Sequence, residues 1–220
     1  MSSRKQYDRE LKNLSSRLVR MAVKSVEAVE HAMTAVKTYD KALAKAVIHG
    51  DDEINTLERE LEQRCLKLLL MQQPVASDLR QVGATMKMIT DIERIGDEAV
   101  DIAELALHHE ACAIPQLRED VISMATVACE MVDAAVTSYI TDDLALAGGT
   151  KSRDDDVDER FVRLRGELGQ HLLTHPQDID EVVDYLMMIK YLERVADHAV
   201  NLCEWVEFKL TGQHKDAAMF

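Results

Sequence analysis

The residues most able to do chemistry in this sequence are rows of carboxylates that recur at intervals of one helical turn. In the stretch DIERIGDEAVDIAEL (91–105), Glu93, Asp97, Asp101 and Glu104 would share one face of a helix. No lysine separates the members of this row, so the carboxylates repel one another unless a positive group offsets their charge. Hard divalent cations, or iron and manganese, are the ions that such an oxygen-rich surface suits.

The acidic row is repeated, because a nearly identical segment occurs one hundred residues later. In YLERVADHAVNLCEW (191–205) the matching positions are Glu193, Asp197, Asn201 and Glu204. Self-similarity at a fixed offset is the signature of a repeated structural unit. The apolar residues between the acids recur at spacings of three and four in both copies, which predicts an amphipathic helix for each.

A second acidic segment precedes each row and would supply a companion face. Asp51 and Asn55 lie in the segment DDEIN, and Asp154 and Asp158 lie at the same positions of the later segment DDDVD. If the two helices of each copy pack side by side, their polar faces would form a groove suited to a metal ion. A plainer interpretation is also open, because acids near a helix start compensate the helix dipole and acidic stripes are common on solvated faces.

Arg94 and Arg194 are the basic residues nearest the two rows. On a helix they could neutralise neighbours about one turn ahead, namely Asp97 and Glu98 in the first copy and Asp197 in the second. The residues alone therefore leave both interpretations of the acidic rows in place, metal ligands or a solvated face.

Other chemistries find no matching motif in the sequence. None of the eight histidines follows a glutamate by three positions, as a ferritin-like di-iron site requires. A glycine-rich phosphate loop, a G-x-S-x-G segment and an H-E-x-x-H segment are all missing from the sequence. The sequence therefore predicts a protein that is not an enzyme.

The elements that must position the acidic rows are helices. Three prolines, eight glycines and an aromatic content of 4% leave long stretches of good helix formers, which predicts an all-α protein. Pro74, Pro115 and Pro176, together with Gly50 and the pair Gly148–Gly149, are expected to separate the helices. The predicted helices lie near 5–48, 51–72, 75–109, 116–146, 154–174 and 178–211.

The repeated order of these helices predicts a tandem of two three-helix bundles related by an internal repeat. Residues 1–113 would form the first bundle, 114–212 the second, and 213–220 a C-terminal tail. With short connections, each unit should run up, down and up again. Within the first unit, Asp40 is expected to break the first helical stretch and to cap a short helix that runs to His49.

The net charge of −14, from 40 acidic and 26 basic residues, limits the classes of partner. It disfavours nonspecific binding to nucleic acid or anionic lipid, because those partners are also negative. It favours cations and basic protein surfaces.

The four cysteines and the N-terminal segment indicate a cellular compartment. Cys65, Cys112, Cys129 and Cys203 form no C-x-x-C pair and are interpreted as small buried residues in a reducing environment. The N-terminus has no apolar core typical of a signal peptide, and no stretch approaches the roughly 20 apolar residues of a membrane span. We therefore expect a cytoplasmic protein with no direct membrane insertion.

Several phrases in the sequence match a known family. QQPVASDLR (72–80), IERIGDEAVDIAE (92–104) and DDEINTLE (51–58) strongly resemble the PhoU family of phosphate-uptake regulators, and DDDVDER (154–160) and LERVADHAVNLCE (192–204) repeat the match. The resemblance covers nearly the whole chain. It implies a tandem of two three-helix bundles and a cytoplasmic negative regulator of the phosphate-starvation response.

The resemblance also implies metal clusters, which some family members carry at paired acidic motifs, one pair in each bundle. Carried over residue by residue, the first site would use Asp51, Asn55, Glu93 and Asp97, and the second Asp154, Asp158, Glu193 and Asp197. Asn55 is neutral where the second copy has Asp158, so the first site lacks one negative charge. Asp101, which aligns with the neutral Asn201, would restore that charge. The two sites are therefore not expected to be equivalent, and the ion could be Fe, Mn, Zn or Mg.

The leading hypothesis is a regulator that works through protein contact. Its implied partners are the ATPase of a phosphate ABC transporter and a sensor histidine kinase, and we expect the chain to form a homodimer. Two other classes stay open. One is an acidic helical scaffold that docks a basic partner, and the other is a metal-dependent phosphohydrolase.

Overall fold

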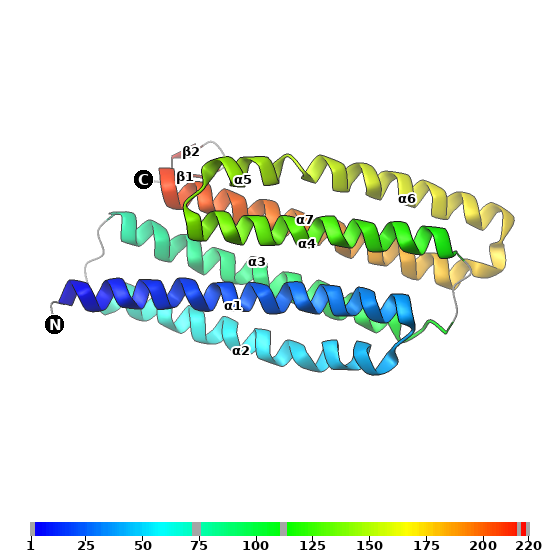
Figure 1. Ribbon diagram of the computed structural model, residues 1–220, viewed down its shortest axis with the longest axis horizontal. Coiled ribbons are helices and arrows are strands. Elements are labelled where there is room, and N and C mark those ends of the chain that lie inside the picture. Colours follow the sequence, from blue (N-terminus) through cyan, green and yellow to red (C-terminus); the bar gives the residue numbers. More distant parts are fainter. Residues whose placement is uncertain (1–2, 72–75, 111–113, 215–216, 219–220) are drawn as a thin grey trace.

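The structure is a computed structural model that describes residues 3–71, 76–110, 114–214 and 217–218. Within these ranges nearly all of the backbone is helical (Figure 1), which confirms the predicted all-α class. A two-residue antiparallel pairing of strands closes the C-terminal end. The elements in chain order are α1 (Ser3–Thr38), α2 (Lys41–Met71), α3 (Ala76–Ala106), α4 (Pro115–Thr141), α5 (Leu144–Lys151), α6 (Asp154–Thr174), the short 3-10 helix η1 (Pro176–Asp178), α7 (Ile179–Thr211), β1 (Gln213–His214) and β2 (Ala217–Ala218).

The helices form the predicted tandem of two three-helix bundles. Helices α1, α2 and α3 run up, down and up, while α4, the α5–α6 pair and α7 repeat this order in the second copy (Figure 1). Helices α3 and α7 lie antiparallel and pack against each other, and α1 packs against α4. We call the α3–α7 contact the seam, because it joins the two copies.

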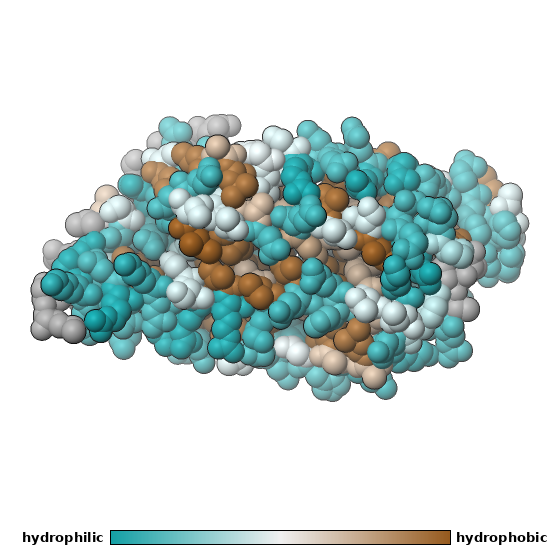
Figure 2. Space-filling view, in the orientation of Figure 1, coloured by the Kyte–Doolittle hydropathy of each residue, from teal (hydrophilic) through white to brown (hydrophobic). Residues whose placement is uncertain are grey.

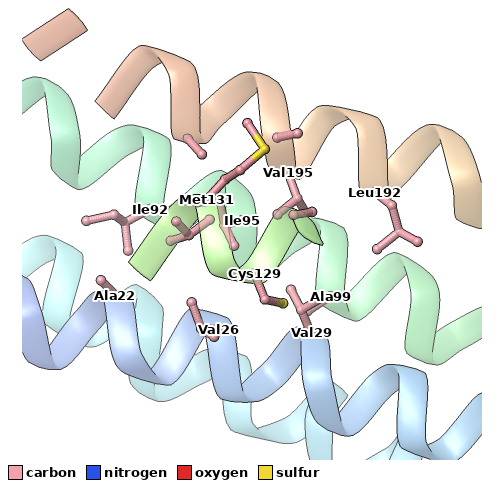
Figure 3. Close-up of a cluster of buried hydrophobic side chains, with 14 of the residues drawn as sticks. Ala22, Val26, Val29, Ile92, Ile95, Ala99, Cys129, Met131, Leu192 and Val195 are labelled. Atoms are coloured by element: carbon pink, nitrogen blue, oxygen red, sulfur yellow. The ribbon is translucent and has the colours of Figure 1, made fainter. Parts of the chain in front are cut away.

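A single apolar core crosses the seam. The apolar stripes predicted for the two acidic phrases are fully buried, as Ile95 and Ala99 on α3 and Val195 on α7 illustrate. Figure 3 shows these side chains converging with Val26 of α1 and Cys129 of α4. Each fully buried side chain of this size contributes about 1.5–3 kcal/mol, so the packing between the copies is a major source of stability.

The same turn joins the first two helices of each copy. Tyr39 and Asp142 both adopt the left-handed conformation, with φ values of 58° and 57°. The following aspartates cap the next helix. Asp40 Oδ1 accepts hydrogen bonds from the amides of Ala42 and Leu43 at 2.9 Å, and Asp143 caps the first turn of α5 in the same manner. The capping role predicted for Asp40 is confirmed.

Two predicted helix breaks are wrong. The short helix after Asp40 does not end near Gly50, because α2 continues through this residue to Met71. A glycine inside a helix costs about 1 kcal/mol relative to alanine. Burial of Val47 and Ile54 on either side contributes more than this cost. The pair Gly148–Gly149 likewise lies inside α5 rather than between helices.

The second copy breaks its helix where the first does not. Helix α5 ends at Lys151 and α6 begins at Asp154, whereas the equivalent part of α2 is continuous. The predicted helix 116–146 also ends early, since the left-handed turn at Asp142 closes α4 after Thr141.

Helix α4 is long and apolar enough to cross a membrane, by length and composition alone, in the part of the chain that the structure describes. This differs from the expectation that no such stretch exists. In the structure α4 packs against α1 and α7, and its apolar residues Met124, Val132 and Ala135 are buried in the core.

Three of the four cysteines have the predicted character. Cys65, Cys129 and Cys203 are buried free thiols. Burial raises the pKa of each thiol to about 12, so they behave as small apolar residues. Cys112 lies outside the described residues.

Candidate metal-binding grooves

The first acidic groove lies between α2 and α3. Asp51 and Asn55 come from α2, while Glu93 and Asp97 come from the facing side of α3. Asn55 Nδ2 donates a hydrogen bond of 2.6 Å to Asp51 Oδ2. The other oxygen, Asp51 Oδ1, is buried and has no hydrogen-bond partner within the described residues. An orphaned carboxylate oxygen of this kind favours a cation beside it.

Gly96 brings the two helices of this groove close together. A Cβ atom at this position would lie 3.1 Å from Ile54 Cδ1 and 3.3 Å from Asp51 Oδ1. The glycine in the first acidic phrase therefore lets α2 approach α3 where Asp51 meets the row on α3. The second copy has Ala196 at the matching position.

The carboxylates of the first groove act on one another electrostatically. Burial raises the pKa of Asp51 and of Glu93, and the nearby Asp97 carboxylate raises both further. Burial also raises the pKa of Glu58, with additional contributions from Glu62 and Asp97. Glu58 therefore belongs to this groove, although the predicted ligand set omits it. Its position one helical turn beyond Asn55 is the signal that would have included it.

Arg94 offsets part of the charge of the first groove. Its Nη1 lies 3.4 Å from Asp97 Oδ2, and its Nε lies 3.5 Å from Glu93 Oε2. The predicted neutralisation of Asp97 is confirmed. The guanidinium is about half exposed, so it could move aside at little cost if a metal ion took its place.

The second groove lies between α6 and α7 and is more strongly acidic. Asp154 and Asp158 on α6 meet Glu193 and Asp197 on α7. Burial raises the pKa of Asp154 to about 6, and the largest added contribution comes from Asp197, followed by Asp158. Burial and then Glu193 also raise the pKa of Asp197. Mutual repulsion among four carboxylates accounts for these additions.

Lys190 closes one end of the second groove. Its Nζ pairs with Glu193 and lies 5.6 Å from the centre of the Phe161 ring. Phe161 stands where the first copy has Glu58, so an aromatic residue and a lysine replace a carboxylate. The second copy thus has no carboxylate at the position equivalent to Glu58, and the two grooves are not equivalent.

The donor sets fit a hard cation by their chemistry. The predicted ligands of the first groove are three carboxylates and the Asn55 amide, with the Glu58 carboxylate beside them, and those of the second are four carboxylates, all groups that oxygen-loving ions accept. With the side chains oriented as they are, no three His, Cys, Asp or Glu side chains among the described residues are grouped so that they could hold one ion. Binding would therefore require side-chain rotations, and would displace Arg94 or Lys190 from its carboxylate partners.

Asn201 forms a hydrogen bond across the seam, and Asp101 interacts electrostatically with residues of both copies. Asn201 Nδ2 donates to Asp91 Oδ1 across the seam at 3.2 Å, and His198 Nδ1 lies 2.9 Å from the same oxygen. Burial raises the pKa of Asp101, the carboxylates of Glu104 and Asp97 raise it further, and the charge of Arg194 on α7 lowers it. The structure therefore places both residues toward the seam.

The second arginine does not neutralise Asp197, contrary to prediction. Arg194 Nη2 instead reaches across the seam to Glu98 Oε1 at 2.9 Å. Glu98 is 1% exposed, and its Oε2 has no hydrogen-bond partner within the described residues. Burial raises the pKa of Glu98 to about 7, although the charge of Arg194 opposes this shift. No repeat-based reasoning finds this contact, because the matching residue of the other copy is His198.

Two packed copies of one helical unit, each with an acidic groove between its second and third long helices, define a duplicated helical-bundle protein. A family model described as the PhoU domain matches residues 18–106 and 121–206, which lie in the first and second copies respectively. The chain belongs to this family, as its repeated acidic phrases predict.

Relatives and solved structures resemble the chain over almost its full length. A protein of Clostridium acetobutylicum, named a phosphate-specific transport system accessory protein PhoU homolog, is 32% identical over 97% of this chain and 98% of its own. A relative of the same name from Aquifex aeolicus is 36% identical over 84% of each chain.

The fold matches solved PhoU structures closely. The crystal structure of PhoU from Pseudomonas aeruginosa superposes with a TM-score of 0.88 at 31% identity, covering 94% of this chain and all of that one. The phosphate transport system regulatory protein PhoU from Streptococcus pneumoniae gives a TM-score of 0.86 at 27% identity, covering 96% of this chain and all of that one.

Proposed function

We propose that this chain is an accessory protein of a phosphate-specific transport system and acts as a negative regulator of phosphate uptake and of the phosphate-starvation response. The observation that carries the proposal is the match to PhoU proteins along nearly the whole of both chains. The two acidic grooves support it as well, because both copies present the paired acidic motifs that resemble those of the PhoU family.

The regulation would proceed through protein contacts in the cytoplasm rather than through turnover of a substrate. The partners would be the ATPase of a phosphate ABC transporter and a sensor histidine kinase, with the chain acting as a homodimer. A contact-based switch needs only a difference in affinity of about 1–3 kcal/mol between two states of the partner. Such a difference requires no catalytic residue.

The grooves would each hold a metal ion as part of this function. Asp51, Asn55, Glu93 and Asp97 would hold it in the first copy, with Glu58 nearby. Asp154, Asp158, Glu193 and Asp197 would hold it in the second. When bound, the ion supplies positive charge that offsets the repulsion among these carboxylates and can accept an oxygen ligand from a partner. The side chains themselves join α2 to α3 and α6 to α7.

The regulatory proposal is tested by measuring alkaline phosphatase activity in phosphate-rich medium, in cells with and without the gene for this protein. We expect high activity in the deletion strain and low activity once the intact gene is restored. Unchanged activity in the deletion strain would contradict the repressor function. Manganese-dependent release of phosphate from a phosphate ester by the purified protein would favour a hydrolase instead.

The metal sites are tested separately in purified protein. The double variant Glu193→Gln and Asp197→Asn removes two charges from the second groove while keeping side-chain size. Metal content measured by mass spectrometry should fall, while the helical circular dichroism signal should not change. Arg163→Gln, an exposed change on α6 at a residue that pairs with Asp120 and Glu167 outside the groove, serves as a control and should keep its metal. Full metal occupancy in the double variant would contradict the ligand assignment.

A further inference from the structure

Two consecutive histidines follow α3 at one end of the seam. Helix α3 ends in a tight turn, in which the amide of His108 donates to the carbonyl of Leu105 at 3.0 Å. Helix α7 begins at the same end of the molecule, because α3 and α7 pack against each other in opposite directions (Figure 1). The turn therefore presents His108 and His109 of the first copy to the first two turns of α7 in the second.

Both histidines lie beside the same carboxylate oxygen of α7. His109 Nε2 lies 3.3 Å from Asp184 Oδ2, and His108 Nδ1 lies 3.6 Å from the same atom. The Asp184 side chain is only 18% exposed, and it forms no ion pair with a lysine or arginine of the described residues. A largely buried carboxylate without such a partner favours another cation beside it.

The Nε2 atom of His109 is buried without a hydrogen bond. His109 is 6% exposed, and its ring packs against that of Tyr185 with 5.5 Å between the ring centres. Although Asp184 Oδ2 is 3.3 Å away, Nε2 has no hydrogen-bond partner within the described residues. A proton shared between the two side chains therefore does not account for their approach, whereas an ion bound between them would satisfy both.

The separation of these atoms is that of two ligands on one zinc ion. Zinc binds imidazole nitrogen at about 2.0–2.1 Å and carboxylate oxygen at about 2.0–2.2 Å, so its tetrahedral ligands lie about 3.3–3.5 Å apart. The distance of 3.3 Å between His109 and Asp184 falls in this range. As the side chains stand, no three of the described His, Cys, Asp or Glu groups could hold one ion. His108, however, is 68% exposed and is free to rotate toward the other two.

The surroundings leave room for an ion and for water. A groove of about 450 Å³ opens beside the cluster, lined by His108, Asp180, Val183 and Asp184. On the face shown in Figure 2, the surface at this end of the molecule is largely hydrophilic, so ions can reach it from water. Three protein ligands and one water molecule are a common set for zinc.

Imidazole nitrogens distinguish this cluster from the two acidic grooves. The grooves offer oxygen atoms alone, which suit magnesium or manganese, whereas imidazole suits zinc and its neighbours among the transition metals. The cluster also contains no lysine or arginine that an incoming ion would have to displace, unlike the grooves with Arg94 and Lys190.

We propose that His108, His109 and Asp184 form a zinc site in which a water molecule is the fourth ligand. The histidines belong to the first copy and the carboxylate to the second, so a bound ion would fasten the two copies together at this end of the seam. The inference is independent of the proposed function and of the metal sites proposed for the two grooves.

The experiment adds Co²⁺, as a spectroscopic substitute for zinc, to full-length protein from which metal has been stripped. Tetrahedral Co²⁺ absorbs visible light far more strongly than the six-coordinate Co²⁺ expected in an oxygen-lined groove, so the strong band reports this site. We expect wild-type protein to gain the strong band at one Co²⁺ per chain and to lose it when excess Zn²⁺ is added. Wild-type protein without a strong band would overturn the proposal.

Two variants each remove one ligand with little effect on the fold. His108→Gln changes an exposed side chain, and Asp184→Asn keeps the shape of the carboxylate. Both should lose the strong band. Their zinc affinity, measured by competition with a chelating dye, should fall by at least about tenfold, the loss that follows even from removing an outer partner of a metal ligand. A strong band that persists in either variant would overturn the proposal.

Two control variants should keep the strong band. His31→Gln removes an exposed histidine of α1, and the double variant Glu193→Gln with Asp197→Asn alters the second groove. Loss of the band in His31→Gln would overturn the ligand assignment. Loss in the double variant would place the tetrahedral ion in the groove and would overturn the proposal as well. Metal that disappears from the grooves while the band persists would contradict neither the zinc site nor its ligands.

Discussion

The two copies of the bundle share one backbone plan and differ in their polar chemistry. The first groove contains Asn55, Glu58 and Gly96, where the second contains Asp158, Phe161 and Ala196. In the first groove, one oxygen of Asp51 accepts a hydrogen bond from Asn55, and the other is buried with no hydrogen-bond partner among the described residues. The second keeps four carboxylates and adds a lysine at one end. Helix packing is thus the common feature of the copies, and charge is the feature that distinguishes them.

The largest effect is expected from a substitution that disturbs the close approach of α2 to α3 at Gly96, a glycine that the second copy lacks. Gly96→Val would place a branched side chain against Ile54 and Asp51, where even a Cβ atom lies 3.1 Å from the nearest heavy atom. We expect the free energy of unfolding to fall by about 2–3 kcal/mol, because overpacking forces α2 away from α3. Urea denaturation measures this loss.

The control for that change is Gly169→Val on α6, where an added Cβ atom meets nothing within 4 Å. It should leave the free energy of unfolding unchanged or raise it slightly, because valine is a better helix former than glycine. An equal loss in both variants would show that helix propensity, and not the close approach, decides the result.

A second prediction concerns the seam, where Glu98 of one copy faces Arg194 of the other. Burial raises the pKa of Glu98 to about 7, so the folded protein holds this proton more tightly than the unfolded chain does. The contribution of Glu98 to the free energy of unfolding should therefore fall as the pH rises from about 4.5 to about 7. Relative to Glu98→Gln, wild-type protein should lose on the order of 1–3 kcal/mol over this window. Parallel stability curves for the two proteins would contradict the prediction.

A third prediction sharpens the contrast between the grooves by exchanging their one differing ligand. Asp158→Asn should lower manganese affinity of the second groove about tenfold, because one carboxylate becomes a neutral amide. Asn55→Asp should raise that of the first groove by a similar factor. Isothermal titration calorimetry of the two variants and of wild type would show the shifts. Equal affinities in all three proteins would mean that these positions do not ligate metal.

The smallest expected effect compares the two helix caps. Asp40 accepts hydrogen bonds from two backbone amides, Ala42 and Leu43, whereas Asp143 accepts one, from Leu146. Asp40→Ala should cost about 1 kcal/mol and Asp143→Ala somewhat less. Thermal unfolding followed by circular dichroism would rank the two. The opposite order would show that the number of capped amides does not set the cost.

Sequence reasoning predicted the parts of the molecule that repeat. Apolar spacing gave the helices and their buried faces, and the offset between copies placed each acidic row opposite its companion segment. Sequence reasoning failed where the structure depends on residues that are close in space but distant in the sequence. Gly50 remains helical because Val47 and Ile54 on either side of it are buried. Arg194 pairs with Glu98 of the other copy and not with Asp197 of its own helix. Neither the helical conformation at Gly50 nor the Arg194–Glu98 ion pair can be predicted from the residues next to it in the sequence.

The core that passes through the seam has a consequence for how the protein could respond to a partner. All the long helices contribute buried side chains to one close-packed core, so a displacement in one copy must be accommodated by the other. A shortened chain that kept only one copy would leave half of this packing open to water. Signals that arrive at one copy can therefore reach the other without a hinge, because the outer helices α2 and α6 also bury side chains in this common core.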